Sequence, residues 1–77
     1  MELTVKFTWY EDERIWISTL MDDRLGLTLD CNSFDGLLEK VKIILYDMIE
    51  QDLKYTGDVK LNIETSRVVS MNIEAKT

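Results

Sequence analysis

The hydrophobic period of this sequence changes once, near residue 33, and that change limits the folds available to the chain. In the first segment, apolar side chains occupy every second position: Leu3, Val5, Phe7 and Trp9. Further along, they recur every three or four positions: Phe34, Leu37, Leu38, Val41, Ile44, Leu45, Met48 and Ile49. The first spacing is typical of a half-buried strand and the second of an amphipathic helix. Strands followed by a single helix predict an α+β fold.

Three strands are expected before the helix, over residues 2–10, 14–20 and 26–31. The first two are separated by three consecutive acidic residues at positions 11–13. Because this stretch lacks the Asn-Gly or Asp-Gly pair of a tight turn, it predicts a longer loop or a bulge. An irregular loop at residues 21–25 separates the second strand from the third.

The helix is expected to run from Ser33 to Asp52 or Leu53. Asn32 or Ser33 suits the N-cap position, because a side-chain oxygen there can accept a hydrogen bond from the first free backbone N–H groups. Gly36 falls in the first turn of this helix, where it costs about 1 kcal/mol relative to alanine.

A fourth strand is expected from Val59, since apolar residues again occupy alternate positions. Residues 58–75 form either one long strand or a hairpin that turns near Ser66, and the length of the run favours the hairpin, with a fifth C-terminal strand. The expected architecture is a two-layer α+β sandwich, an antiparallel sheet with the helix on one face (β-β-β-α-β). The residues expected beneath the helix are Leu3, Val5, Phe7, Ile15, Ile17, Leu27 and Leu29. Strict alternation then places Trp16 on the open face.

The length and composition of the chain limit the functions that it can have. The 77 residues make a single domain, residues 1–77, with a thin core. One cysteine, Cys31, excludes an internal disulfide, and the start of the chain has no signal peptide, so a cytoplasmic protein is expected. The formal net charge of −6 argues against direct nucleic-acid binding and fits either plain solubility or a basic partner.

No motif for enzymatic chemistry is recognisable. The chain has no histidine, which removes the commonest general base, and its three glycines are scattered rather than grouped in a phosphate-binding loop. The acidic residues do not follow EF-hand spacing, so neither a metal nor a cofactor is expected. Cys31 is expected to pack as a small apolar residue, with a reactive thiolate near the helix start as the alternative. A carboxylate-dependent nuclease is a further, weaker alternative.

The order of these features resembles the HicB-like superfamily and, within it, the small bacterial domain of unknown function DUF1902. The matching segments are Phe7-Thr8-Trp9-Tyr10, Glu11-Asp12-Glu13, Trp16-Ile17-Ser18-Thr19, Asp22-Asp23, Gly26-Leu27, Ser33-Phe34 and Leu37-Leu38-Glu39-Lys40-Val41. The resemblance covers about residues 3–53 and, more weakly, the last strand. The chain departs from the pattern at Ser18, where the family prefers alanine, and at Leu25, where it usually has proline. The loop before Gly26 is also one residue longer than is typical.

The resemblance implies a non-enzymatic antitoxin that covers a small basic ribonuclease toxin, without the separate DNA-binding domain of many HicB proteins. The residues expected to contact such a partner are Trp16, Asp22, Asp23, Arg24 and Asp30, together with acidic positions of the helix. Two simpler interpretations stay open: Trp16 packs within the fold, and the acidic residues are merely solvated. The alternative function is an orphan domain that only self-associates, and a homodimer or larger oligomer is expected in either case.

Overall fold

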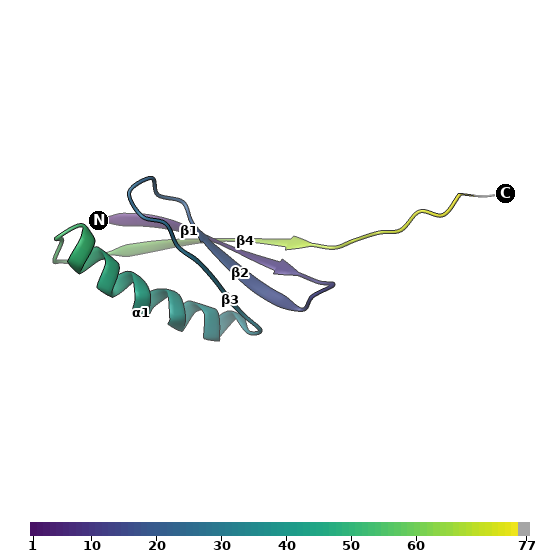
Figure 1. The fold of residues 1–77 in the computed structure, drawn as a ribbon, viewed down its shortest axis with the longest axis horizontal. Coiled ribbons are helices and arrows are strands. Elements are labelled where there is room, and N and C mark those ends of the chain that lie inside the picture. Colours follow the sequence, from purple (N-terminus) through teal and green to yellow (C-terminus); the bar gives the residue numbers. More distant parts are fainter. Residues whose placement is uncertain (76–77) are drawn as a thin grey trace.

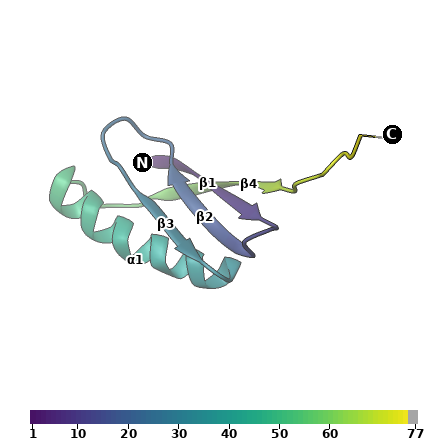
Figure 2. The ribbon, with the colours of Figure 1, turned by 45° about the vertical axis from the view of Figure 1, so that its right-hand side comes forward.

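Four strands and one helix make up the computed structural model, which describes residues 1–75. Their order is β1 (Glu2–Tyr10), β2 (Ile15–Leu20), β3 (Thr28–Cys31), α1 (Phe34–Asp52) and β4 (Lys60–Val68). The sheet forms one layer and α1 forms the other (Figures 1 and 2). The predicted α+β class and the β-β-β-α-β order are confirmed.

The sheet is mixed, so the expectation of an antiparallel sheet was wrong in one respect. Its strand order is β3-β2-β1-β4. β2 pairs antiparallel with both β1 and β3, whereas β4 pairs parallel with β1 along its whole length. The reason is that β3 runs in the direction of β1 and a single helix then carries the chain back. The strand that follows must therefore run in the same direction as β1.

The pairing of β1 with β2 reverses the predicted faces of β2. Tyr10 pairs with Ile15, Trp9 with Trp16 and Phe7 with Ser18. Paired residues share a face of the sheet, so Trp16 and Ser18 lie on the helix side while Ile15 lies on the open side. Ile17 pairs with Thr8 and also lies on the open side. Alternation had separated the two sets correctly but assigned them to the wrong faces, as a register shift of one residue does.

The core lies between α1 and the sheet. Its buried apolar residues are Leu3, Val5, Phe7, Leu20, Leu25, Leu37, Val41, Leu45 and Ile49. The four helical members recur every four residues and so form one stripe along α1. Three predicted core residues of β1 are confirmed, and Leu27 and Leu29 are half-buried against the same cluster. The loop between β2 and β3 contributes Leu25, which strand alternation could not identify.

Both helix ends have identifiable signals. The Ser33 hydroxyl accepts a hydrogen bond from the backbone N–H of Gly36 (3.0 Å), so Ser33, rather than the alternative Asn32, is the N-cap. A Cβ on Gly36 would lie 2.7 Å from the Ser33 Oγ and 2.8 Å from the Cys31 Sγ, so this glycine permits a close approach. At the other end, Lys54 adopts a positive φ of 53°, and the N–H of Tyr55 donates to the carbonyl of Ile49 (3.3 Å). That left-handed residue ends the helix.

The last described segment does not form the expected hairpin. β4 passes through Ser66 without a turn and ends at Val68, and residues 69–75 continue without regular secondary structure. The segment leads away from the body of the domain (Figure 1), which gives the structure its long dimension of 63 Å against 23 and 16 Å. β1 ends at Tyr10, which pairs with Val68, so the residues after Val68 have no strand beside them. A fifth strand is therefore absent from residues 1–75.

Candidate protein-binding surface

An aromatic cluster lies on the helix side of the sheet, at the end where α1 begins. Trp9 and Trp16 are a cross-strand pair of β1 and β2, with ring centroids 5.4 Å apart. Phe34, the first residue of α1, meets Trp16 edge-on at 5.2 Å and also contacts Phe7 at 5.1 Å. Phe7 is fully buried, while both tryptophans are only half-buried because they lie beyond the start of the helix.

A charged network borders this cluster. The indole N–H of Trp9 donates to the carboxylate of Glu11, and the Arg67 guanidinium donates to the same oxygen at 2.7 Å. These contacts tie the turn after β1 to the edge strand β4. The two hydrogen bonds, that from Trp9 foremost, lower the pKa of the Glu11 carboxyl below its ordinary value, so Glu11 is ionised at neutral pH.

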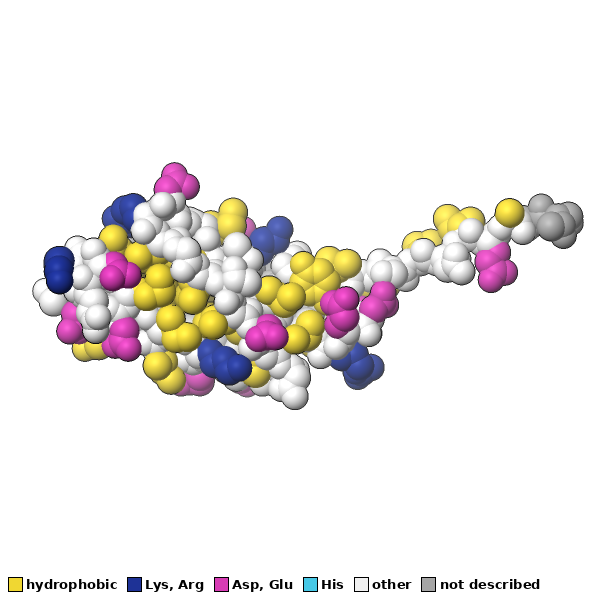
Figure 3. Space-filling model, in the orientation of Figure 1, with side chains coloured by type: hydrophobic (Ala, Val, Ile, Leu, Met, Phe, Trp, Pro, Cys, Tyr) yellow, Lys and Arg dark blue, Asp and Glu magenta, His cyan; other side chains and the backbone are white. Residues whose placement is uncertain are grey.

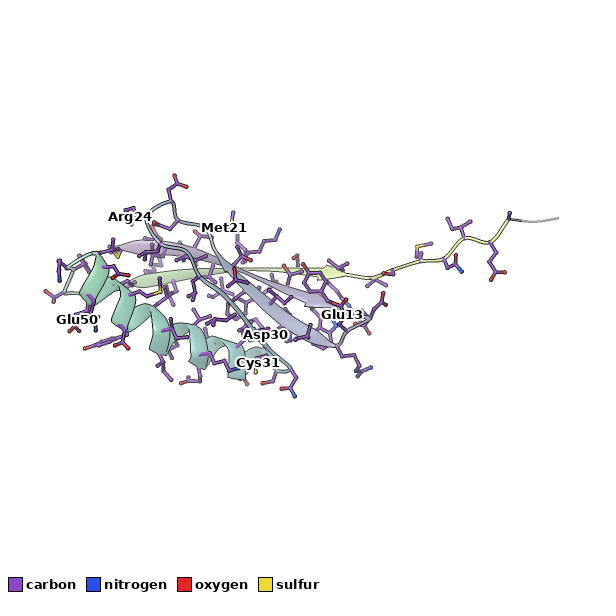
Figure 4. The ribbon with its side chains drawn as sticks, viewed as in Figure 1. Glu13, Met21, Arg24, Asp30, Cys31 and Glu50 are labelled. Atoms are coloured by element: carbon purple, nitrogen blue, oxygen red, sulfur yellow. The ribbon has the colours of Figure 1, made fainter. Side chains whose placement is uncertain are left out.

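The cluster and the network line an open groove, here called the aromatic groove. It is lined by Trp9, Glu11, Trp16, Asn32, Thr65, Ser66 and Arg67. Asp12 and Glu13 extend the turn next to it and are exposed. Figure 3 shows acidic and hydrophobic side chains adjacent to one another at this end of the body, and Figure 4 marks Glu13 at the tip of the β1–β2 turn. Amphipathic aromatic rings beside exposed carboxylates are suited to binding a basic protein surface.

Sequence reasoning identified one half of the tryptophan pair and missed the other. Trp16 lies in the aromatic groove, although on the helix side of the sheet rather than on the open face where it was predicted. Trp9 had only been placed on the same strand face as Leu3, Val5 and Phe7, and Arg67 had not been considered as part of a site. A signal for this site was present in the chain: two tryptophans flank a strongly acidic turn, so pairing across that turn brings both rings beside its charges.

Two of the predicted contact residues, Asp22 and Arg24, bind each other within the loop between β2 and β3. The Asp22 carboxylate accepts hydrogen bonds from the Arg24 backbone N–H (2.8 Å) and from its guanidinium (3.0 and 3.2 Å). These bonds, the side-chain ones first, lower the pKa of Asp22. Because Arg24 neutralises Asp22, only Asp23 of this loop offers an exposed acid without such a bond within residues 1–75.

The five predicted contact residues do not form one surface. Asp30 pairs with Ile17 and is therefore on the open face, opposite to Trp16. Arg24 and Asp30 lie well apart along the molecule (Figure 4), since the loop that holds Arg24 is at the far end of β2 and β3 from the aromatic groove. The antiparallel meander places the turn between β1 and β2 and the loop between β2 and β3 at opposite ends of the sheet, as three consecutive antiparallel strands require.

Cys31 lies beside the N-terminus of α1, half-buried against the core cluster. A hydrogen bond from the Ser33 backbone to the sulfur is the main cause that lowers the pKa of the Cys31 thiol. Within the described part of the chain, no three acidic or cysteine side chains are grouped as metal ligands would be. Across residues 1–75, the single helix is not apolar enough over a sufficient length to span a bilayer.

Known proteins give two points of comparison. The structure is similar to the crystal structure of hypothetical protein TTHA1013 from the extremely thermophilic bacterium Thermus thermophilus, with a TM-score of 0.71 and 22% identity. The similarity covers 92% of this chain and 100% of that one and establishes a shared fold. No curated protein matches the chain. Residues 2–75 match the domain of unknown function DUF1902, and the chain therefore belongs to that family.

Proposed function

We propose that this protein is a non-enzymatic protein-binding domain of the HicB antitoxin type, which covers a small basic ribonuclease. The observation that carries the proposal is the aromatic groove: two half-buried tryptophans beside a turn with exposed acids. Tryptophan is favoured at the energetic centre of protein interfaces, and acidic side chains around it match a basic partner in charge. The resemblance to HicB antitoxins suggests that this partner is a ribonuclease. A ribonuclease fits the acidic turn, because a surface that binds RNA is itself basic.

The groove offers two kinds of contact to such a partner. The exposed parts of the Trp9 and Trp16 rings would receive an apolar side chain or the stem of a lysine or arginine. Asp12 and Glu13 would face the charged ends of those side chains, while Glu11 is already paired with Arg67 at 2.7 Å. Asp12 and Glu13 form no ion pair among the described residues, so they, rather than Glu11, are expected to determine how fast the partner associates.

The test first isolates a binding partner and then measures whether the domain inhibits that partner's RNA cleavage. The full chain is immobilised, exposed to nuclease-treated lysate of the host, and the retained proteins are identified by mass spectrometry. A retained small basic protein is then purified and assayed for RNA cleavage with and without an equimolar amount of the domain. Inhibition at one domain per nuclease supports the proposal, whereas a retained protein without nuclease activity, or no small basic protein at all, contradicts it.

Two charge-reversal variants locate the surface. Asp12→Lys with Glu13→Lys alters the turn beside the aromatic groove. Asp47→Lys with Glu50→Lys makes the same change of charge on the exposed side of α1, whose acids the sequence also suggested as contacts but which do not line the groove. The turn variant should weaken inhibition tenfold or more, because it reverses charges beside the groove. The helix variant should leave inhibition nearly unchanged, because at about physiological salt charges more than roughly 8 Å away are screened. Equal effects would show that the groove is not the interface.

A second candidate function is self-association alone, without a toxin. The exposed apolar segment beyond β4 favours it, because Met71 and Ile73 are more than four-fifths exposed. A domain that is recovered from lysate only with copies of itself would support this alternative over the first.

A further inference from the structure

The segment after β4 exposes apolar side chains in a regular pattern. Val69, Met71 and Ile73 are 58%, 83% and 84% exposed. They continue the odd-numbered positions of β4 that face the helix side, where Leu61 and Ile63 pack against the core. Figure 2 confirms that this segment runs free of the sheet and of α1. Three large, exposed apolar side chains at alternate positions of one segment indicate a surface that is covered in the working protein.

The outer edge of β4 has a matching row of unpaired backbone groups. β4 is the last strand of the sheet, with β1 on one side of it. The N–H of Lys60 donates to the carbonyl of Met1, and the carbonyl of Val68 accepts from the N–H of Glu11. Even-numbered residues of β4 thus direct their backbone groups toward β1. Odd-numbered residues direct theirs outward, because neighbouring residues of a strand point in opposite directions.

An apolar groove runs beside this edge on the helix side. It lies between the second half of α1 and the start of β4, has a volume of about 420 Å³, and is lined mainly by Leu45, Tyr46, Ile49, Tyr55, Val59 and Leu61. Leu61 and Val59 belong to the same odd-numbered set as the exposed residues of the C-terminal segment. An added strand along the outer edge of β4 would therefore direct one of its two rows of side chains toward this groove.

We propose that two copies of this chain exchange residues 69–75, each segment adding antiparallel to the outer edge of the β4 strand of the other copy. A two-fold axis perpendicular to the sheet pairs residues of equal parity, so that odd residues of the segment meet odd residues of β4. The outward-facing backbone groups of both strands are then the ones that pair. The exchange produces one continuous sheet of eight domain strands, with both helices on the same side.

The side chains select the register. An axis through Val68 places Ile73 opposite Ile63 of the partner subunit and diagonal to Leu61 of the partner subunit, at the apolar groove. On the open side, the same register places polar residues opposite polar ones: Ser70 with Ser66, Asn72 with Glu64, and Glu74 with Asn62. An axis through Arg67 would instead oppose the two copies' arginines directly, which is unfavourable.

The experiment compares two matched variants of the full chain by light scattering coupled to size-exclusion chromatography. Met71→Asp with Ile73→Asp places charges on the exchanged segment. Met21→Asp with Ile43→Asp makes the same substitutions at exposed positions outside it, 59% and 65% exposed. We expect the unmodified chain and the second variant to have twice the 9.1 kDa chain mass, and the first variant to be a folded monomer by circular dichroism.

Several results would overturn the proposal: a monomeric unmodified chain at high concentration, a dimer that persists in Met71→Asp/Ile73→Asp, or a dimer that both variants lose. A cysteine test then examines the register in a Cys31→Ser background. Val68→Cys should form an intermolecular disulfide under mild oxidation, because an axis through this residue places its two copies side by side, while Ile43→Cys should not. A tail-dependent dimer without the Val68→Cys cross-link would refute the stated register. Neither measurement involves a toxin, so nuclease binding is decided separately, whereas a monomeric unmodified chain would also exclude self-association alone. The stated register places Val69 and Met71 opposite Arg67 and Thr65 of the partner subunit, two positions that line the aromatic groove.

Discussion

Truncating Leu20 should destabilise the domain far more than truncating Ile17, although both residues lie in β2 and both lose the same three carbon atoms on mutation to alanine. Leu20 is 7% exposed and belongs to the core, whereas Ile17 is half-exposed on the open face. At about 0.8 kcal/mol per buried methylene, the three carbons of Leu20 contribute roughly 2.4 kcal/mol, and the cavity left behind adds about 1 kcal/mol. For Ile17, which is about half-exposed, roughly half of that burial energy is lost and no cavity forms, so Ile17→Ala should cost about 1 kcal/mol.

These differences are large for a domain of this size. At about 0.05–0.15 kcal/mol per residue, 77 residues correspond to a free energy of unfolding of roughly 4–12 kcal/mol. Leu20→Ala should therefore lower the Tm by about 14–27 °C and Ile17→Ala by about 4–8 °C. Urea and thermal unfolding, followed by circular dichroism at equal protein concentration, measure both. Equal losses, or a larger loss for Ile17→Ala, would refute the β1–β2 register and with it the placement of Trp16.

Three further predictions concern single positions. Ser33→Ala should cost about 1 kcal/mol in urea unfolding by removing the N-cap, while Ser33→Asp should retain the stability of the unmodified chain. Lys54→Gly should raise the free energy of unfolding by up to about 1 kcal/mol, because Lys54 occupies a left-handed conformation that glycine adopts without strain; a loss of stability would contradict this explanation. The lowered pKa of Glu11 stabilises the fold above the ordinary pKa of a glutamate, and this contribution disappears as the pH falls through the lowered value. Any Tm advantage of the unmodified chain over Glu11→Gln at about pH 7 should therefore vanish in acid, and an advantage that grows in acid would exclude the Trp9–Glu11–Arg67 network as its source.

Part of the candidate site was accessible to sequence reasoning, and part was not. Trp16 and the acidic turn are local features, and tryptophan is a residue type favoured at interfaces. Trp9 and Arg67 join them through pairing across two strands, one of which lies more than fifty positions along the chain. Conversely, Asp22 lies in a charged stretch of the sequence, but in the structure its charge is neutralised by Arg24, two residues away. Charge counted along a chain does not reveal which carboxylates remain free.

The sequence by itself determined the elements: three strands, a helix with its N-cap at Asn32 or Ser33, and a fourth strand. It could do so because side-chain periodicity and capping are local properties of neighbouring residues. Only the tertiary structure decided which face of β2 packs under α1, that β4 runs parallel to β1, and that the chain beyond Val68 leaves the sheet. Each of these depends on how strands pair across the molecule. A strand carries two equivalent faces and two edges, and its own sequence does not specify which of them will be covered.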